Sequence, residues 1–185
     1  MQGSLEDWMD RGGPVDTHAR SYDLWARDLV DVKLPTKYQI PENSKENFVD
    51  MDFVVQAIEQ QQQVHEGSIS WTLIIDTRGS SFSKGHMPGA VHIPYTSLVE
   101  PENELVLKQT SELLEILKSK GVVDALDDKG GTSKVLLTCG SAVSVCHMAL
   151  VLEECGYCRS GPPLIYDGSW NEYGSDPTTP KVTND

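Results

Sequence analysis

Residues 135–148 have the sequence Val135-Leu-Leu-Thr-Cys139-Gly-Ser-Ala-Val-Ser144-Val-Cys-His-Met148. The first residues form a short apolar run, which is typical of a strand buried on both faces of a parallel sheet. Apolar residues then recur at helical spacing and predict a helix over 142–154, which Gly156 can end. A loop of small residues beginning at Cys139 separates the two. This order of strand, loop and helix predicts a functional site at the carboxyl end of the strand.

The segments around this stretch alternate between short apolar runs and amphipathic patterns. Further buried strands are predicted at residues 71–75, 91–93 and 164–166. Helices are predicted from Asp50 or Asp52 to about residue 63, and from Thr110 or Ser111 to Gly121. Because strands and helices alternate, we expect an α/β fold: a single domain with a mainly parallel sheet and helices on both faces.

The chain has 185 residues, which suffices for one domain and additional segments. We expect a lead-in or linker over residues 1–45, a domain over residues 46–178 and a tail over residues 179–185. The terminal segments are assigned in this way because they show no sustained apolar periodicity. No run of about 18 apolar residues occurs, so no membrane-spanning segment is expected.

The net charge of −13 limits the classes of partner. Nucleic acids and anionic membranes bind to clusters of Lys and Arg, so we expect neither as a partner. Small anionic substrates remain compatible with an acidic protein if the site attracts them locally.

The four cysteines lie within 20 residues of one another, at positions 139, 146, 155 and 158. A secreted disulfide framework would spread them along the chain, so we expect a reducing compartment, cytoplasmic or mitochondrial. Cys155 and Cys158 have redox-motif spacing, but they end a helix, whose dipole would raise their thiol pKa, and structural roles are favoured. We expect Cys146 to lie in the core. A zinc site would need two further ligands, and no metal or organic cofactor is expected.

The loop after Cys139 carries the chemistry. Backbone N–H groups at a helix N-terminus can bind an anion, and they would lower the pKa of the Cys139 thiol. The candidate binding residues are Gly140, Ser141, Ala142, Val143, Ser144 and Val145. Ser144 either donates a hydrogen bond to substrate or caps the helix.

Phosphatases of the Cys-x5-Arg type also have a reactive cysteine at the end of a strand, and they need an arginine six positions after it to bind the phosphate. The sixth position after Cys139 is Val145, so the loop suits a persulfide anion better than a phosphate ester. The alternative to a reactive Cys139 is a buried cysteine with a structural role only.

Four motifs resemble the signatures of rhodanese domains, in order, over about residues 48–178. They are Leu73-Ile-Ile-Asp-Thr-Arg78, Gly85-His-Met-Pro-Gly-Ala90-Val-His-Ile-Pro94, Cys139-Gly-Ser-Ala-Val-Ser144 and Tyr166-Asp-Gly-Ser-Trp170. The cysteine loop, followed by Cys146-His147, is most similar to the C-terminal catalytic domain of 3-mercaptopyruvate/thiosulfate sulfurtransferases. The stretch Leu5-Glu-Asp-Trp8 is similar to the segment that follows the first domain of two-domain members, so an N-terminal rhodanese domain is a candidate partner.

The resemblance implies a sulfurtransferase in which Cys139 is the catalytic nucleophile and carries sulfur as a persulfide. The donor would be a small anion, 3-mercaptopyruvate or thiosulfate, and the acceptor a thiol or cyanide, with a thioredoxin-like protein as one candidate. Arg78 would lie near the cleft and attract the donor, or form a structural ion pair with Asp76. Ala142 replaces the usual glycine and should fit only with a negative φ. The alternatives are a protein-to-protein sulfur-relay or persulfide carrier and a non-catalytic rhodanese-like module.

Overall fold

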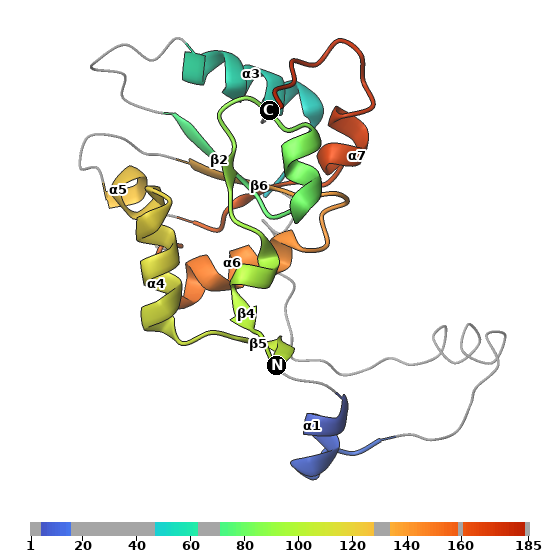
Figure 1. The fold of residues 1–185 in the computed structure, drawn as a ribbon, viewed down its shortest axis with the longest axis vertical. Coiled ribbons are helices and arrows are strands. Elements are labelled where there is room, and N and C mark those ends of the chain that lie inside the picture. The colour runs from blue at the N-terminus through green and yellow to red at the C-terminus, as the bar shows by residue number, and fades with distance from the viewer. Residues whose placement is uncertain (1–4, 16–46, 63–70, 128–133, 159–160, 184–185) are drawn as a thin grey trace, which may run out of the picture. The chain divides into compact units, whose positions relative to one another are not determined.

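The computed structural model describes residues 5–15, 47–62, 71–127, 134–158 and 161–183 (Figure 1). The chain divides into two compact units, Met1–Ser44 and Lys45–Asp185. In the first unit, helix α1 (Leu5–Asp10) is followed by a turn in which Trp8 Nε1 donates to the Pro14 carbonyl at 3.0 Å. The remainder of the predicted lead-in lies outside the described residues.

A five-stranded sheet forms the centre of the second unit, with the strand order β1-β7-β6-β2-β3. Every neighbouring pair is parallel, which confirms the predicted mainly parallel sheet. The strands are β1 (Phe48–Val49), β2 (Thr72–Asp76), β3 (Val91–His92), β6 (Lys134–Thr138) and β7 (Leu164–Tyr166). β2 and β6 are apolar along most of their length because successive side chains point to opposite faces and both faces are covered.

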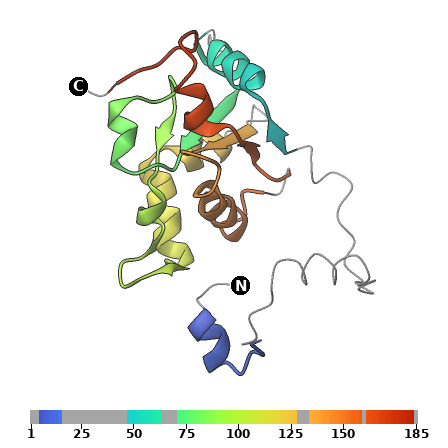
Figure 2. The same cartoon turned by 90° about the vertical axis from the view of Figure 1, so that its right-hand side faces the viewer.

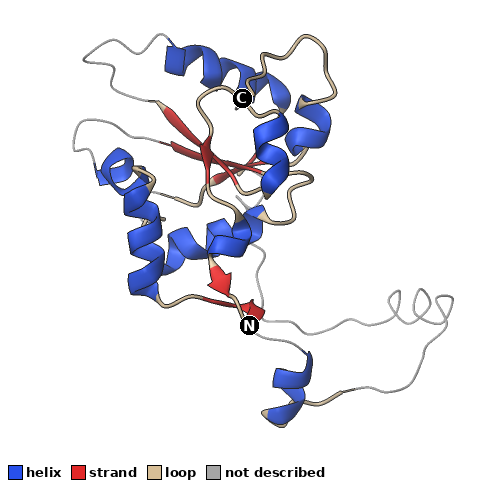
Figure 3. Cartoon of the chain, viewed as in Figure 1, coloured by secondary structure: helices blue, strands red, loops and turns tan. Residues whose placement is uncertain are grey.

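Helices cover both faces of this sheet, as predicted (Figures 2 and 3). On one face, α3 (Met51–Gln62) and α7 (Ser169–Tyr173) pack a core that includes Ile74, Leu136 and Tyr166. On the other face, α4 (Thr110–Ser119), α5 (Val122–Asp127) and α6 (Val145–Glu154) pack a larger core that includes Leu73, Ile75 and Leu137. The alternating side chains of β2 and β6 therefore hold two separate apolar layers together.

Capping residues set the helix boundaries. Asp50 Oδ1 accepts a hydrogen bond from the Phe53 N–H at 3.0 Å, so Asp50 rather than Asp52 begins α3. The Glu112 carboxylate accepts from the Gln109 N–H at 3.3 Å at the start of α4. After α4 the chain turns at Gly121, whose φ of 70° suits glycine.

Several short elements were not predicted. β4 (Val99–Glu100) and β5 (Asn103–Leu107) form an antiparallel pair, and two 3-10 turns are η1 (Ser80–Lys84) and η2 (Tyr95–Ser97). These segments are short and rich in polar residues, so they have no clear apolar period. The helix predicted from residue 142 begins at Val145 instead, because residues 142–144 form part of the loop.

The segment predicted as a tail contacts the domain. The Thr179 hydroxyl is buried and donates to the Tyr173 carbonyl at 2.7 Å. His86 and Val182 exchange backbone hydrogen bonds of 2.9 and 3.1 Å in an isolated antiparallel bridge. The domain thus extends to at least Val182. None of the helices in the described ranges is long and apolar enough to cross a membrane.

Candidate active site

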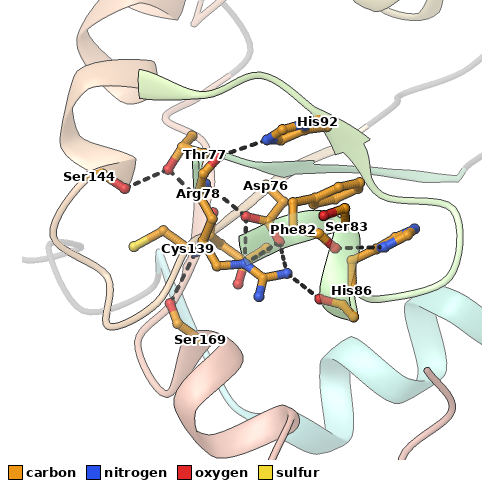
Figure 4. A network of polar contacts seen from close by, with 12 residues as sticks. Asp76, Thr77, Arg78, Phe82, Ser83, His86, His92, Cys139, Ser144 and Ser169 are labelled. Carbon is orange, nitrogen blue, oxygen red and sulfur yellow. Dashed lines mark hydrogen bonds and ion pairs between the residues drawn. The ribbon is translucent and has the colours of Figure 1, made fainter. Parts of the chain in front are cut away.

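Three neighbouring parallel strands end at one edge of the sheet and bring distant residues together. Asp76 at the end of β2 is in register with Thr138 at the end of β6, and Leu137 is in register with Ile165 of β7. The residues that follow these strands therefore meet at the same edge, where binding sites form in parallel sheets. They include Thr77 after β2, Cys139 after β6 and Ser169 after β7, which Figure 4 shows around the same site.

Cys139 lies within a cradle of hydrogen-bond donors. The residue is 2% exposed, and burial alone would raise the pKa of its thiol. The Ser144 hydroxyl and the backbone N–H groups of Ser141, Ser144 and Val145 all hydrogen-bond the sulfur and outweigh burial, so the thiol pKa is lowered. The site therefore favours a negatively charged sulfur.

Ser144 does not cap the helix, although it occupies the residue before α6. Its side chain makes no capping hydrogen bond; the hydroxyl instead contacts the Cys139 sulfur and lies 2.8 Å from Thr77 Oγ1. Of the two roles left open for Ser144, the structure excludes the capping role.

The loop is held from behind by the segment after β7. Ser169 Oγ accepts hydrogen bonds from the Cys139 and Ala142 N–H groups at 3.3 and 3.1 Å, and it donates to the Tyr166 carbonyl at 2.9 Å. The N–H of Trp170 donates to the Cys139 carbonyl at 2.9 Å. Because these backbone groups are paired behind the loop, its other N–H groups are free to face the sulfur.

A pocket of about 410 Å³ opens beside this loop. It is lined by side chains and backbone from four separate segments: Arg78, Gly79, Ser81, Lys84, Tyr95, Gly140, Ser144, Trp170 and Asn171. Of the predicted loop residues, Gly140 and Ser144 line the pocket. Val143 does not, and its side chain is 72% exposed.

Arg78 lines the pocket and also forms the structural ion pair with Asp76 that was considered for it. Its Nε donates to the two Asp76 carboxylate oxygens at 3.1 and 2.9 Å, and its Nη2 donates to one of them at 2.7 Å (Figure 4). Nη2 also donates to the Gly85 carbonyl at 2.8 Å, and the guanidinium carbon lies 4.3 Å from the centroid of the Trp170 ring. The ion pair with the Asp76 carboxylate thus compensates the positive charge of Arg78.

Lys84 is the basic residue that sequence reasoning missed. It lies at the end of η1, is exposed and lines the pocket. No basic residue occurs in the cysteine loop, so the sequence offered no direct sign that a lysine 55 positions earlier would face the same pocket. The one feature of the sequence that points to a role for Lys84 is its position directly before the Gly85-His86 turn.

The two histidines near Arg78 are structural. His86 Nδ1 lies 3.1 Å from the Phe82 carbonyl oxygen, within hydrogen-bonding distance. His92 Nε2 lies 2.7 Å from the Arg78 carbonyl. Both rings stack on Phe82, with centroid distances of 3.9 and 4.2 Å. The stack supports η1 and with it the wall of the pocket.

A family model described as Rhodanese-like domain matches residues 56–176, which is more than half of the chain. The chain belongs to the rhodanese-like domain family.

Several named proteins are similar to this chain in sequence or in structure. The 3-mercaptopyruvate sulfurtransferase of Mus musculus is 40% identical over 90 residues, which cover 48% of this chain and 26% of the mouse protein. The sulfur carrier protein TtuD of Thermus thermophilus is 24% identical over 188 residues, covering 95% of this chain and 58% of that protein. An anaerobic ergothioneine biosynthesis enzyme from Chlorobium limicola shares the fold with a TM-score of 0.66 and 17% identity, covering 100% of this chain and 41% of its own. The chain therefore spans only part of the length of these relatives.

The cysteine loop of this rhodanese-like domain contains a residue in an unfavourable backbone conformation. Ala142 has a φ of 55°, so the expectation that it would keep a negative φ is wrong. The left-handed region costs a residue with a Cβ about 1 kcal/mol or more. The hydrogen bond from the Ala142 N–H to Ser169 Oγ offsets part of this cost and keeps the loop closed.

We expect Ala142→Gly to stabilise the rhodanese-like domain by about 0.5–1 kcal/mol, because glycine adopts positive φ without steric cost. Urea unfolding measures this change. Ala149→Gly, in the interior of α6, is the matched control and should destabilise by about 1 kcal/mol because glycine weakens a helix. Equal destabilisation by both substitutions would contradict the strain assigned to Ala142.

The remaining cysteines lie apart from the cradle. Cys146 is exposed, so its predicted place in the core is wrong; it lies on the outer face of α6. The thiol pKa values of Cys155 and Cys158 are raised, chiefly by burial and then by the neighbouring Glu154 and Glu153 respectively. The direction agrees with the prediction, whereas the cause differs. Within the described part of the chain, no group of three or more His, Cys, Asp or Glu residues is placed to hold a metal ion.

Proposed function

We propose that this rhodanese-like domain is a sulfurtransferase that carries sulfane sulfur on Cys139 as a persulfide. The single observation that supports this most strongly is the cradle, in which one hydroxyl and three backbone N–H groups hydrogen-bond the Cys139 sulfur and lower the pKa of its thiol. A thiolate is the nucleophilic form of cysteine, and the same donors suit the terminal anion of a persulfide.

The proposed reaction has two steps. The Cys139 thiolate attacks the sulfane sulfur of thiosulfate or the sulfur of 3-mercaptopyruvate and forms a new S–S bond. The old bond to that sulfur breaks, and its electron pair leaves with sulfite, or with a carbon that takes up a proton to give pyruvate. A thiolate or cyanide then attacks the outer sulfur of Cys139–S–S⁻, and the Cys139 thiolate is regenerated.

A protein-to-protein sulfur carrier is a second candidate. The relative named as a sulfur carrier protein matches 95% of this chain, more than the mouse sulfurtransferase does. Val143, 72% exposed in the cysteine loop, also presents an apolar side chain that a partner protein can contact. In this role the pocket would accept sulfur from a protein persulfide and pass it to a protein thiol, for example in a thioredoxin-like partner.

Mass spectrometry tests the proposal. The reduced chain is incubated with thiosulfate or with 3-mercaptopyruvate, its intact mass is measured, and fragmentation of the peptide that contains the cysteines then locates any added sulfur among the four of them. We expect a gain of one sulfur atom on Cys139, and the more efficient donor identifies the subclass. A gain from a protein persulfide alone would favour the carrier, and no gain from any donor would contradict both candidates.

Lys84 is expected to attract the donor anion, because the charge of Arg78 is compensated by Asp76. We expect Lys84→Gln to raise the KM for an anionic donor by about twofold to fivefold with little change in kcat, the size typical of an exposed charge pair. Steady-state kinetics at low ionic strength measure the effect, and salt should reduce it.

Lys134→Gln is the matched control for Lys84→Gln. Lys134 is exposed at the amino end of β6, opposite the pocket end of the strand, and its substitution changes the net charge equally. We expect no change in KM from this control. Equal effects of the two substitutions would mean that only the net charge matters and that Lys84 has no local role.

A further inference from the structure

Thr77 is a fully buried residue whose side chain points to the cysteine loop. Its Oγ1 lies 2.8 Å from the Ser144 hydroxyl oxygen and 3.5 Å from the Thr138 carbonyl oxygen, and the residue is 0% exposed (Figure 4). The position is set by the sheet, because the Thr77 N–H donates to the same Thr138 carbonyl at 3.0 Å and extends the β2–β6 pairing by one residue.

The number of hydrogens decides the direction of these bonds. Each hydroxyl has one hydrogen to donate and lone pairs to accept. A hydrogen bond from the Ser144 hydroxyl contributes to the lowered pKa of the Cys139 thiol. A thiolate can only accept, so Ser144 is the donor in this bond when the thiolate is present. Thr77 must then be the donor in its 2.8 Å contact with Ser144. Its competing acceptor, the Thr138 carbonyl, is 3.5 Å away and already accepts a backbone N–H.

We propose that Thr77 is a positioning residue of the active site: its hydroxyl donates to Ser144 and thereby directs the only hydroxyl hydrogen of Ser144 at the sulfur of Cys139. Burial matters here, because water cannot replace a donor at a site that is 0% exposed. The proposal rests on the role proposed for Cys139 as a nucleophile and extends it to a residue that does not touch the sulfur. The same chain of donors would support the persulfide anion after sulfur uptake.

The test measures the reactivity of Cys139 as a function of pH. Alkylation by iodoacetamide is followed at Cys139 itself, by fragmentation of the peptide between Lys134 and Arg159, because this peptide contains all four cysteines. Thr77→Val removes the donor and keeps the shape of the side chain. We expect the midpoint of its pH profile to move to higher pH, with alkylation below the midpoint slower by about threefold to tenfold.

Two substitutions serve as controls for this profile. Thr77→Ser keeps the hydroxyl and should restore the parent profile. Thr138→Val removes another fully buried hydroxyl, one residue before Cys139, that has no hydrogen-bond partner among the described residues, so it should leave the profile unchanged. The titratable and charged groups around the pocket, which are Asp76, Arg78, Lys84, Tyr95 and His147, are the same in all variants.

A double-variant cycle tests whether Thr77 acts through Ser144. Ser144→Ala alone should move the midpoint in the same direction, and adding Thr77→Val to Ser144→Ala should then change nothing further. An unchanged profile in Thr77→Val, or equal shifts in Thr77→Val and Thr138→Val, or additive effects in the double variant would overturn the proposal. Thr77→Ala removes the same donor and gives a second version of the test if Thr77→Val does not fold.

The outcome is separate from that of the proposed function, because alkylation reports the thiolate and not sulfur transfer. Persulfide formation with no effect of Thr77 would leave the sulfurtransferase intact and reject the positioning role. A shifted pH profile in a protein that takes up no sulfur would support the positioning role of Thr77 and reject the sulfurtransferase.

Discussion

Replacing Cys139 with serine is expected to abolish sulfur transfer, with kcat reduced by at least about 10³-fold, because an oxygen at this position cannot form a persulfide. The variant should still fold, since serine is similar in size and its hydroxyl meets the same donors from Ser141, Ser144 and Val145. Release of pyruvate or sulfite from the donor measures the loss, and intact mass shows whether any sulfur is retained.

Cys146→Ser is the matched control for this loss. Cys146 lies seven residues further along and is exposed, whereas Cys139 is buried in the cradle. If Cys139 is the carrier, the control should keep the full activity and should still gain one sulfur atom. Sulfur uptake in Cys139→Ser that disappears in Cys146→Ser would instead assign the carrier role to the exposed thiol.

The sheet and its active edge were predictable because each depends on contiguous residues. The apolar runs predicted as strands at 71–75 and 135–138 have no polar face, which is typical of strands covered on both sides, and they fall within β2 and β6 with differences of one residue at the ends. Alternation with helices then indicated parallel strands, whose carboxyl ends must share an edge. The place of Cys139 at the head of a loop at this edge followed from the sequence alone.

The rest of the candidate site depends on contacts between distant residues that no local pattern reveals. Lys84 reaches the pocket because η1 folds back beside the loop, and Ser169 reaches the loop because β7 lies next to β6. The start of α6 was missed because Ala142 suits a helix by composition. In the structure Ala142 instead has a positive φ, and its N–H donates to Ser169 Oγ. Tertiary hydrogen bonds thus overrode local propensity.

The ion pair of Asp76 and Arg78 links the active-site edge to the turn that follows η1. Asp76 is 0% exposed and Arg78 7%, and the Asp76 carboxylate also accepts the Arg78 N–H at 2.9 Å. Arg78 in turn holds the Gly85 carbonyl and stacks on Trp170, whose backbone N–H donates to the Cys139 carbonyl. Removal of the carboxylate would leave a guanidinium buried without a compensating charge, which is among the costlier defects in a protein.

We therefore expect Asp76→Ala to destabilise the domain by about 3–5 kcal/mol, measured as a lower midpoint of urea unfolding. Folded domains have about 5–15 kcal/mol of stability, so the loss should be evident in the far-ultraviolet signal at modest urea concentrations. The double variant Asp76→Ala/Arg78→Met should recover a large part of the loss, because it removes the buried charge and keeps an apolar stem beside Trp170. If the double variant is instead as unstable as the sum of its single variants, the cost arises from lost packing, and the uncompensated charge of Arg78 is not its cause.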